Sequence, residues 1–191
     1  MTNDPSRQST LQIGDRSIPI RPDTVLASTG NPGACTCEFL SWGVWASSAR
    51  DPLNNGKTFV AVGSYVAGTP SVQLPMTGMA TYNGSMVGFA SNNGHISPAS
   101  GTYQNAWNFQ NGTGVFNGTF DNRNYSGTTQ ATGGPGSTTF AGNFSGGLRS
   151  GNLNGGFFSS PSDAAAYQAG TFSIGNARSR YQATGIFAGQ R

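Results

Sequence analysis

The sequence predicts an all-β protein whose main body is an eight-stranded antiparallel up-and-down β-barrel, preceded by a short, handle-like β extension. Three observations support this. Short apolar runs alternate with clusters of Gly, Asn, Ser and Pro, several runs show the period of two of a half-buried strand, and the triplet Gly-x-Phe recurs in the C-terminal half. The 12 Phe, 6 Tyr and 3 Trp residues argue against a disordered chain, although 29 residues are Gly and only 9% are charged.

The chain divides into three predicted parts. Residues 1–34 are rich in Pro, Asp, Ser and Thr and predict an extended arm. Residues 35–70 contain two strand-like runs, at 37–46 and 58–68, separated by the turn-rich stretch "SSARDPLNNG" and forming the handle-like extension. A Pro-bounded linker, "TPSVQLP", then leads into the predicted barrel, which we assign to residues 71–191.

The barrel is expected to begin with a hairpin in "TGMATYNGSMVGFA", residues 77–90. Asn83 and Gly84 stand between two apolar-rich runs, and Asn-Gly is a strong signal for a type I′ turn because both residues tolerate positive φ. The sequence therefore predicts strands at 77–83 and 85–91 with a turn at Asn83 and Gly84.

Six further runs complete the eight expected strands: 101–109, 113–120, 138–145, 151–158, 166–174 and 180–188. The stretch "TGGPGSTT" at 132–139 predicts a hairpin loop, and "PSDAAAY" at 161–167 predicts at most one helical turn. A two-sheet sandwich uses the same strand signals and is the alternative architecture.

The Gly-x-Phe triplet favours the closed barrel. Residues i and i+2 of a strand share a face, so each Gly lies beside its Phe in the interior, and such small–large alternation fills a tapering barrel. The predicted interior side chains are Tyr103, Trp107, Phe109, Phe144, Phe157, Phe172 and Phe187.

Charge and motif content exclude several classes of function. The formal net charge of +3 comes from ten basic and seven acidic side chains with no basic stripe, which argues against nucleic-acid binding. From residue 77 onward the only carboxylates are Asp121 and Asp163, and no G-x-S-x-G motif accompanies the single histidine, so we expect no enzymatic activity. No apolar run of membrane-spanning length and no signal-peptide pattern is visible.

The single histidine, His95, is a candidate axial haem ligand, with Tyr103, Met79 or Met86 nearby in sequence. A solvated loop histidine is the alternative, and no cofactor is otherwise expected.

A second candidate site is the aromatic cluster of Phe39, Trp42 and Trp45 in "CEFLSWGVW". These side chains form either an exposed protein-binding patch or the packing between barrel and extension. Cys35 and Cys37 are spaced for either a strained disulfide or two free thiols, and no metal site is predicted.

Several segments together resemble a known family: "YVAGTP…LPMTGMATYNGSMVGFA" (65–90), "WNFQNGTGVFNGTFDNRNYSGT" (107–128), "FAGNFSGG" (140–147), "LNGGFFSS" (153–160) and "QAGTFSI…YQATGIFAGQR" (168–191). They resemble the β-barrel domain of transferrin-binding-protein-B-like surface proteins, over roughly residues 37–191. The resemblance implies an eight-stranded barrel behind a β handle, displayed on the Gram-negative outer surface, that binds host transferrin, haemoglobin, complement factor H or haem without catalysis. It transfers no ligand-contact residue to this chain.

We therefore expect a non-enzymatic binding domain, exposed on the cell surface or outer membrane or secreted, whose loops on a rigid barrel engage a host or self protein. One alternative is a carrier of haem or another small hydrophobic ligand. Another is a structural module of an adhesin or surface assembly, with self-association through the N-terminal arm.

Overall fold

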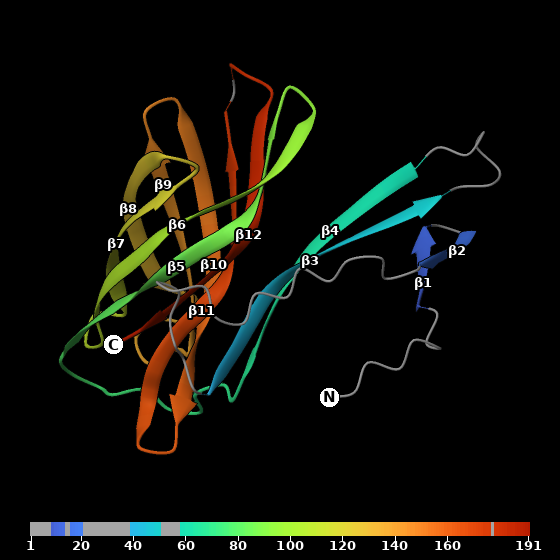
Figure 1. Cartoon of the computed structure of the whole chain (residues 1–191). Helices are drawn as coiled ribbons and strands as arrows, with labels where there is room; N and C mark the ends of the chain where they lie inside the picture. Colours follow the sequence, from blue (N-terminus) through green and yellow to red (C-terminus); the bar gives the residue numbers. More distant parts are fainter. Residues whose placement is uncertain (1–8, 14–15, 21–38, 51–57, 177) are drawn as a thin grey trace.

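A computed structural model describes residues 9–13, 16–20, 39–50, 58–176 and 178–191 (Figure 1). Side chains are described for 39–42, 64–176 and 178–191. Within these ranges the chain consists of strands and turns, with no helix. The strands before the barrel are β1 (Ser9–Ile13), β2 (Arg16–Ile20), β3 (Leu40–Arg50) and β4 (Thr58–Gly68). The barrel strands are β5 (Met79–Asn92), β6 (His95–Asn108), β7 (Thr113–Phe120), β8 (Arg123–Ala131), β9 (Thr139–Gly146), β10 (Arg149–Ser160), β11 (Asp163–Gly175) and β12 (Tyr181–Gln190).

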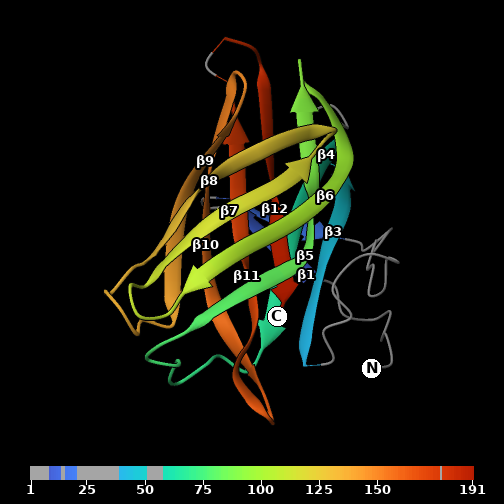
Figure 2. The same ribbon diagram turned by 90° about the vertical axis from the view of Figure 1, so that its left-hand side faces the viewer.

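The eight strands β5 to β12 form a closed antiparallel barrel in which each strand pairs with its neighbours in sequence. Closure comes from the pairing of the last strand with the first, where Ile186 of β12 lies opposite Val87 of β5. Figure 2 shows β6, β7 and β8 crossing the barrel wall obliquely, as the tilt of a closed barrel requires. The predicted eight-stranded barrel is confirmed, and the sandwich alternative is wrong.

The predicted hairpin at Asn83 and Gly84 is also wrong. Both residues lie in the middle of the 14-residue strand β5, and the first barrel turn is the next Asn-Gly pair, Asn93 and Gly94. Their φ angles of 51° and 86° are those of a type I′ turn. Gly84 is needed for a different reason, because a Cβ there would collide with the backbone of β12 at the Ala188 carbonyl oxygen.

Two other local predictions need correction. The strand β8, "RNYSGTTQA", was not expected, because it is polar except for Tyr125 and Ala131 and so lacks a clear apolar alternation. The stretch "PSDAAAY" forms the β10–β11 turn and the start of β11 rather than a helical turn, because Asp163 pairs with Ser160 and Tyr167 with Phe158 of β10. The loop predicted in "TGGPGSTT" is confirmed between β8 and β9.

The interior is filled by side chains. All seven predicted core residues are at most 4% exposed. Aromatic rings pack edge to face, as Trp107 and Phe157 do with ring centroids 5.1 Å apart. A polar group of four side chains is buried among them: the Gln168 carbonyl Oε1 accepts hydrogen bonds from the Tyr103 hydroxyl at 2.7 Å and from Asn105 Nδ2 at 3.0 Å, and Thr129 Oγ1 donates to Asn105 Oδ1 at 3.2 Å.

The extension is a β3–β4 hairpin that packs one end against the outside of the barrel (Figure 1). Leu40 and Trp42 of β3 are buried in a cluster with outward-facing residues of β11 and β12, among them Tyr167, Ile186 and Ala188. Strands β1 and β2 form a separate two-stranded sheet. The division into arm, extension and barrel at residues 34 and 70 stays a prediction.

Candidate functional site

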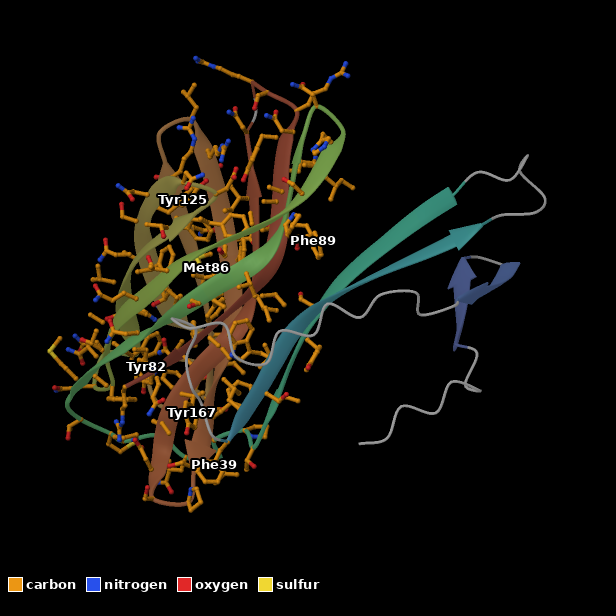
Figure 3. All side chains as sticks on the ribbon, viewed as in Figure 1. Phe39, Tyr82, Met86, Phe89, Tyr125 and Tyr167 are labelled. Carbon is orange, nitrogen blue, oxygen red and sulfur yellow. The ribbon has the colours of Figure 1, made fainter. Side chains whose placement is uncertain are left out.

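Apart from the tyrosines, the ionisable side chains of the barrel lie at its two ends rather than on its wall. We call the end formed by the turns 93–94, 121–122, 147–148 and 176–180 the upper rim, and the end formed by the other turns and the C-terminus the lower rim. Nitrogen-tipped side chains stand at the upper end of the barrel in Figure 3. The ionisable side chains of the upper rim are His95, Asp121, Arg123, Arg149, Arg178 and Arg180, and those of the lower rim are Asp163 and Arg191.

The two rims therefore differ in charge. At the lower rim Arg191 Nε and Asp163 Oδ2 form a salt bridge of 2.5 Å, so the charges there cancel. At the upper rim four arginines face one aspartate, which leaves a formal charge of +3 with His95 neutral. The upper rim is thus the positively charged end of the barrel.

One upper-rim arginine is already engaged. Arg149 Nη1 lies 3.2 Å from Asp121 Oδ2, and the Arg149 guanidinium carbon lies 3.3 Å from the centroid of the Tyr181 ring. Burial raises the pKa of the Tyr181 hydroxyl above its usual value, so the ring stays neutral beneath the cation. The arginines left exposed, with no acidic partner among the described side chains, are Arg123, Arg178 and Arg180.

The upper-rim turns are short and hold their side chains in place. Asp121 and Asn122, with φ angles of 50° and 57°, form a second type I′ turn directly before Arg123. The β11–β12 loop is longer, but its ends are joined by a hydrogen bond from the Asn176 amide to the Tyr181 carbonyl at 3.2 Å. Within it the Arg178 amide donates to Asn176 Oδ1 at 2.8 Å.

An apolar groove of about 450 Å³ lies on the outer wall just below the β11–β12 loop. We call it the Phe89 groove and define it by Phe89, Ile96, Ser173, Gln182 and Thr184, from strands β5, β6, β11 and β12. Ile96 is 52% exposed and lies in the groove with the half-buried Phe89, so the two form a small apolar patch.

A second groove, of about 930 Å³, crosses the outer faces of β5 to β9 and is lined by amides and hydroxyls. Its side chains bind one another across the strands: Gln104 Nε2 donates to Asn83 Oδ1 at 2.9 Å, and the hydroxyls of Thr102 and Thr119 lie 3.0 Å apart. This polar surface therefore satisfies much of its own hydrogen-bonding capacity.

The structure places His95 at the exposed start of β6, in the upper rim. None of its three suggested haem co-ligands lies beside it. Met79 starts β5 at the opposite end of the same hairpin, and Tyr103 and Met86 are buried inside the barrel. In the described residues no group of three or more His, Cys, Asp or Glu side chains is placed to hold a metal ion.

The aromatic cluster is divided by the structure. Trp42 is buried between the β3–β4 hairpin and the barrel, whereas Phe39 is 41% exposed. The side chain of Trp45 and both cysteines, Cys35 and Cys37, lie outside the described residues.

Sequence reasoning missed the upper rim as a unit. Its basic side chains at 95, 123, 149 and 178 follow one another at intervals of 28, 26 and 29 residues, which is two strands and two turns. In an up-and-down barrel every second turn lies at the same end, so charges at this interval converge. That interval was the signal that could have identified the cluster.

Comparisons with known proteins bear on the fold. No family model matches the chain, and no curated protein matches it. The apo crystal structure of the haemoglobin receptor HpuA from Kingella denitrificans is similar over 86% of this chain, with a TM-score of 0.52 and 18% sequence identity. HpuA in complex with human haemoglobin is similar over 78% of this chain, with a TM-score of 0.44 and 19% identity. The chain spans 59% of the length of the apo receptor and 54% of the receptor in the complex.

No helix among the described residues is long and apolar enough to cross a membrane.

Proposed function

We propose that this chain is a non-enzymatic, transferrin-binding-protein-B-like domain of the bacterial cell surface that binds a protein through one end of a rigid barrel. The observation that carries the proposal is the closed barrel with a packed interior, in a chain whose fold is similar to that of the haemoglobin receptor HpuA. Because a fold alone does not determine function, the proposal also depends on the interior and the surface of this barrel.

The packed interior favours a protein ligand over a small one. Trp107, Tyr103 and Phe157 are each 1% exposed and fill the barrel, and the grooves found among the described residues lie on the outer wall. Sites for small ligands are usually clefts or cavities of about 300–1,000 Å³ that bury most of the surface of the ligand, and a groove on an outer wall leaves one side of its ligand open to solvent. The barrel is better suited to act as a scaffold for its turns and outer surface.

The ionisable groups support a binding role as well. Asp121 is paired with Arg149, and Asp163 with Arg191, so neither carboxylate of the barrel is free to act as a general base in a cleft. The remaining exposed arginines supply charge for recognition rather than a catalytic pair.

Surface plasmon resonance on the immobilised full chain tests the proposal. Haemoglobin, transferrin and complement factor H are passed over it separately, and we expect saturable binding of one of them with a Kd of about 1 µM or tighter, equivalent to about 8 kcal/mol. Chain whose fold has been lost in urea serves as the control surface and should not bind. Weak, non-saturable responses to all three proteins would contradict the proposal.

Sedimentation velocity of the free chain distinguishes a receptor domain from the alternative, a structural module that self-associates. A monomer at micromolar concentration is expected for a receptor domain. Concentration-dependent assembly together with no response in the resonance experiment would favour the structural module of a surface assembly.

A further inference from the structure

The Phe89 groove continues an apolar interface that the molecule already uses. On the outer wall of the barrel, Ile186 and Ala188 of β12 are buried, with Val87 of β5 packed against them. The β3–β4 hairpin covers this stripe with Leu40 and Trp42. The lower half of the outer surface where β5 pairs with β12 is therefore already covered by the hairpin.

Above this point the apolar stripe continues beyond the described side chains that cover it, Leu40 and Trp42. Phe89 is the next outward-facing residue of β5 after Val87, since Gly88 between them faces the interior. Figure 1 shows the β3–β4 hairpin diverging from the barrel towards its distal end, and Figure 3 shows Phe89 on the side of the barrel that faces the hairpin. Beside Phe89, the exposed Ile96 makes the uncovered part of the stripe a hydrophobic surface.

Two cations that have no acidic partner among the described side chains border this surface. Gly175 and Gln182 line the groove, and the loop between them carries Arg178 and Arg180, both exposed. Among the polar members of the groove, the Ser173 hydroxyl donates to Asn152 Oδ1 at 3.2 Å and the Thr184 hydroxyl to the Phe172 carbonyl at 3.3 Å. Both hydroxyl oxygens can still accept from a peptide backbone, and the Gln182 amide can donate and accept. An apolar centre with a polar and charged edge is the common arrangement of protein–protein interfaces.

We infer that the Phe89 groove and the Arg178–Arg180 loop together form the docking surface for an extended segment of the partner protein in which apolar side chains alternate with carboxylates. The inference rests on the proposed function and adds the face and the chemistry of the partner. The apolar side chains pack on Phe89 and Ile96, and the carboxylates pair with the two arginines. Charge complementarity of this kind mainly sets specificity and the rate of association.

The test uses isotope-labelled full chain and three synthetic ten-residue peptides. One alternates Glu with Leu and Phe, one has Lys in place of every Glu, and one has Ser in place of every Leu and Phe. We expect only the first to shift backbone amide resonances, and the shifts should cluster in the upper halves of β5, β6, β11 and β12. Equal binding of the Lys peptide, or shifts centred on the polar groove of β5 to β9, would overturn the inference.

Matched variants show which side chains bind the acidic peptide. Arg178→Glu combined with Arg180→Glu should weaken binding of the acidic peptide by about tenfold or more, and Phe89→Ser with Ile96→Ser should do the same. Gln130→Glu and Val115→Ser are the controls, because they add a carboxylate and remove an apolar side chain at exposed positions on β8 and β7 that do not line the groove. Parent-like amide spectra show that each variant is folded, and equal losses in controls and test variants would overturn the inference.

Two further experiments distinguish a failure of this inference from a failure of the proposed function. Vesicles of anionic phospholipid test a lipid occupant, and pelleting of the chain with them that depends on the same four residues would overturn the protein assignment. If haemoglobin, transferrin or factor H binds the chain but binds the groove variants equally well, the inference fails while the proposed function stands. If the peptide binds the groove but no protein of the panel binds, the proposed function fails in its present form.

Discussion

Phe172 illustrates how single residues hold the barrel together. Its ring is 2% exposed and packs edge to face on Phe120, with centroids 4.8 Å apart. The residue opposite it on β12 is Gly185, where a Cβ would lie 2.9 Å from the Phe172 ring. The large side chain thus occupies the space that the glycine leaves.

Replacing Phe172 by Ala should lower the free energy of unfolding by about 3–5 kcal/mol, because the cavity cannot be refilled by a glycine neighbour. Urea unfolding followed by tryptophan fluorescence measures the change. Val115→Ala on the outer face of β7, where the side chain is 55% exposed, is the control and should change stability by less than about 0.5 kcal/mol. Similar small losses in both variants would contradict the assignment of Phe172 to the core.

The contribution of Tyr103 to the stability of the barrel depends on pH. Its ring stacks on Phe187 with centroids 4.6 Å apart, and its hydroxyl donates to Gln168. Burial raises the pKa of this hydroxyl well above its usual value of 10. The unfolded chain therefore releases this proton at a lower pH than the folded chain does.

It follows that the contribution of Tyr103 to stability is fully present below pH 10 and is lost as the pH rises above it. We expect Tyr103→Phe to cost about 1 kcal/mol at pH 8 through the lost hydrogen bond, and the difference from the parent to shrink or reverse at pH 11. Urea unfolding of both proteins at the two pH values checks this. A difference that does not change with pH would show that the hydroxyl does not titrate with unfolding.

At the scale of the strand, glycines facing the interior permit the close approach of neighbouring backbones. Gly88 of β5 lies opposite Gly185 of β12. A Cβ at Gly88 would collide with the Thr184 carbonyl oxygen and lie 2.6 Å from the Gly185 Cα. The two strands that close the barrel meet at this point, so the glycine is a condition of closure.

Gly88→Ala should therefore destabilise the barrel by about 1–3 kcal/mol or prevent its folding, whereas Gly175→Ala should have little effect. At Gly175 of β11 no atom lies within 4 Å of an added Cβ, which makes it the matched control. Soluble yield and urea unfolding report both outcomes. Equal stabilities of the two variants would show that the barrel relaxes to accept a methyl group at its closing seam.

At the scale of the whole molecule, the wall and the rims have different roles. The wall is built of uncharged side chains, and the net positive charge of the barrel is concentrated at one end. This distribution supports recognition at the upper rim and the adjoining Phe89 groove. It also places His95 on an exposed edge rather than in a pocket.

We therefore expect no histidine-dependent haem binding. Titration of haemin into the parent and into His95→Ala should give the same weak absorbance change at about 400 nm, because none of the suggested second ligands lies beside His95. A saturable Soret shift that is lost in the variant would contradict this expectation and favour the alternative function of a haem carrier.

The sequence by itself determined the fold class, the closure of the barrel and its core. These depend on local features: the period of two, the turn residues and the pairing of Gly with Phe on one face. The Gly-x-Phe triplets correctly marked Phe144, Phe157, Phe172 and Phe187 as interior. Local features gave a wrong prediction for the first hairpin turn, because the sequence contains two Asn-Gly pairs and the wrong one was assigned to the turn. Gly84 is required by its contact with β12, about 100 residues away, and a local pattern does not show that contact.

Only the tertiary structure decided which side chains lie together at the upper rim and in the Phe89 groove. Arg123 and Arg178 are far apart in sequence, and they share a rim because alternate turns of the barrel lie at the same end. The Phe89 groove likewise depends on the pairing of β12 with β5 and on where the β3–β4 hairpin leaves the wall. Pairing between the first and last strands of a barrel is a long-range contact, so no local pattern contains the neighbours that it creates.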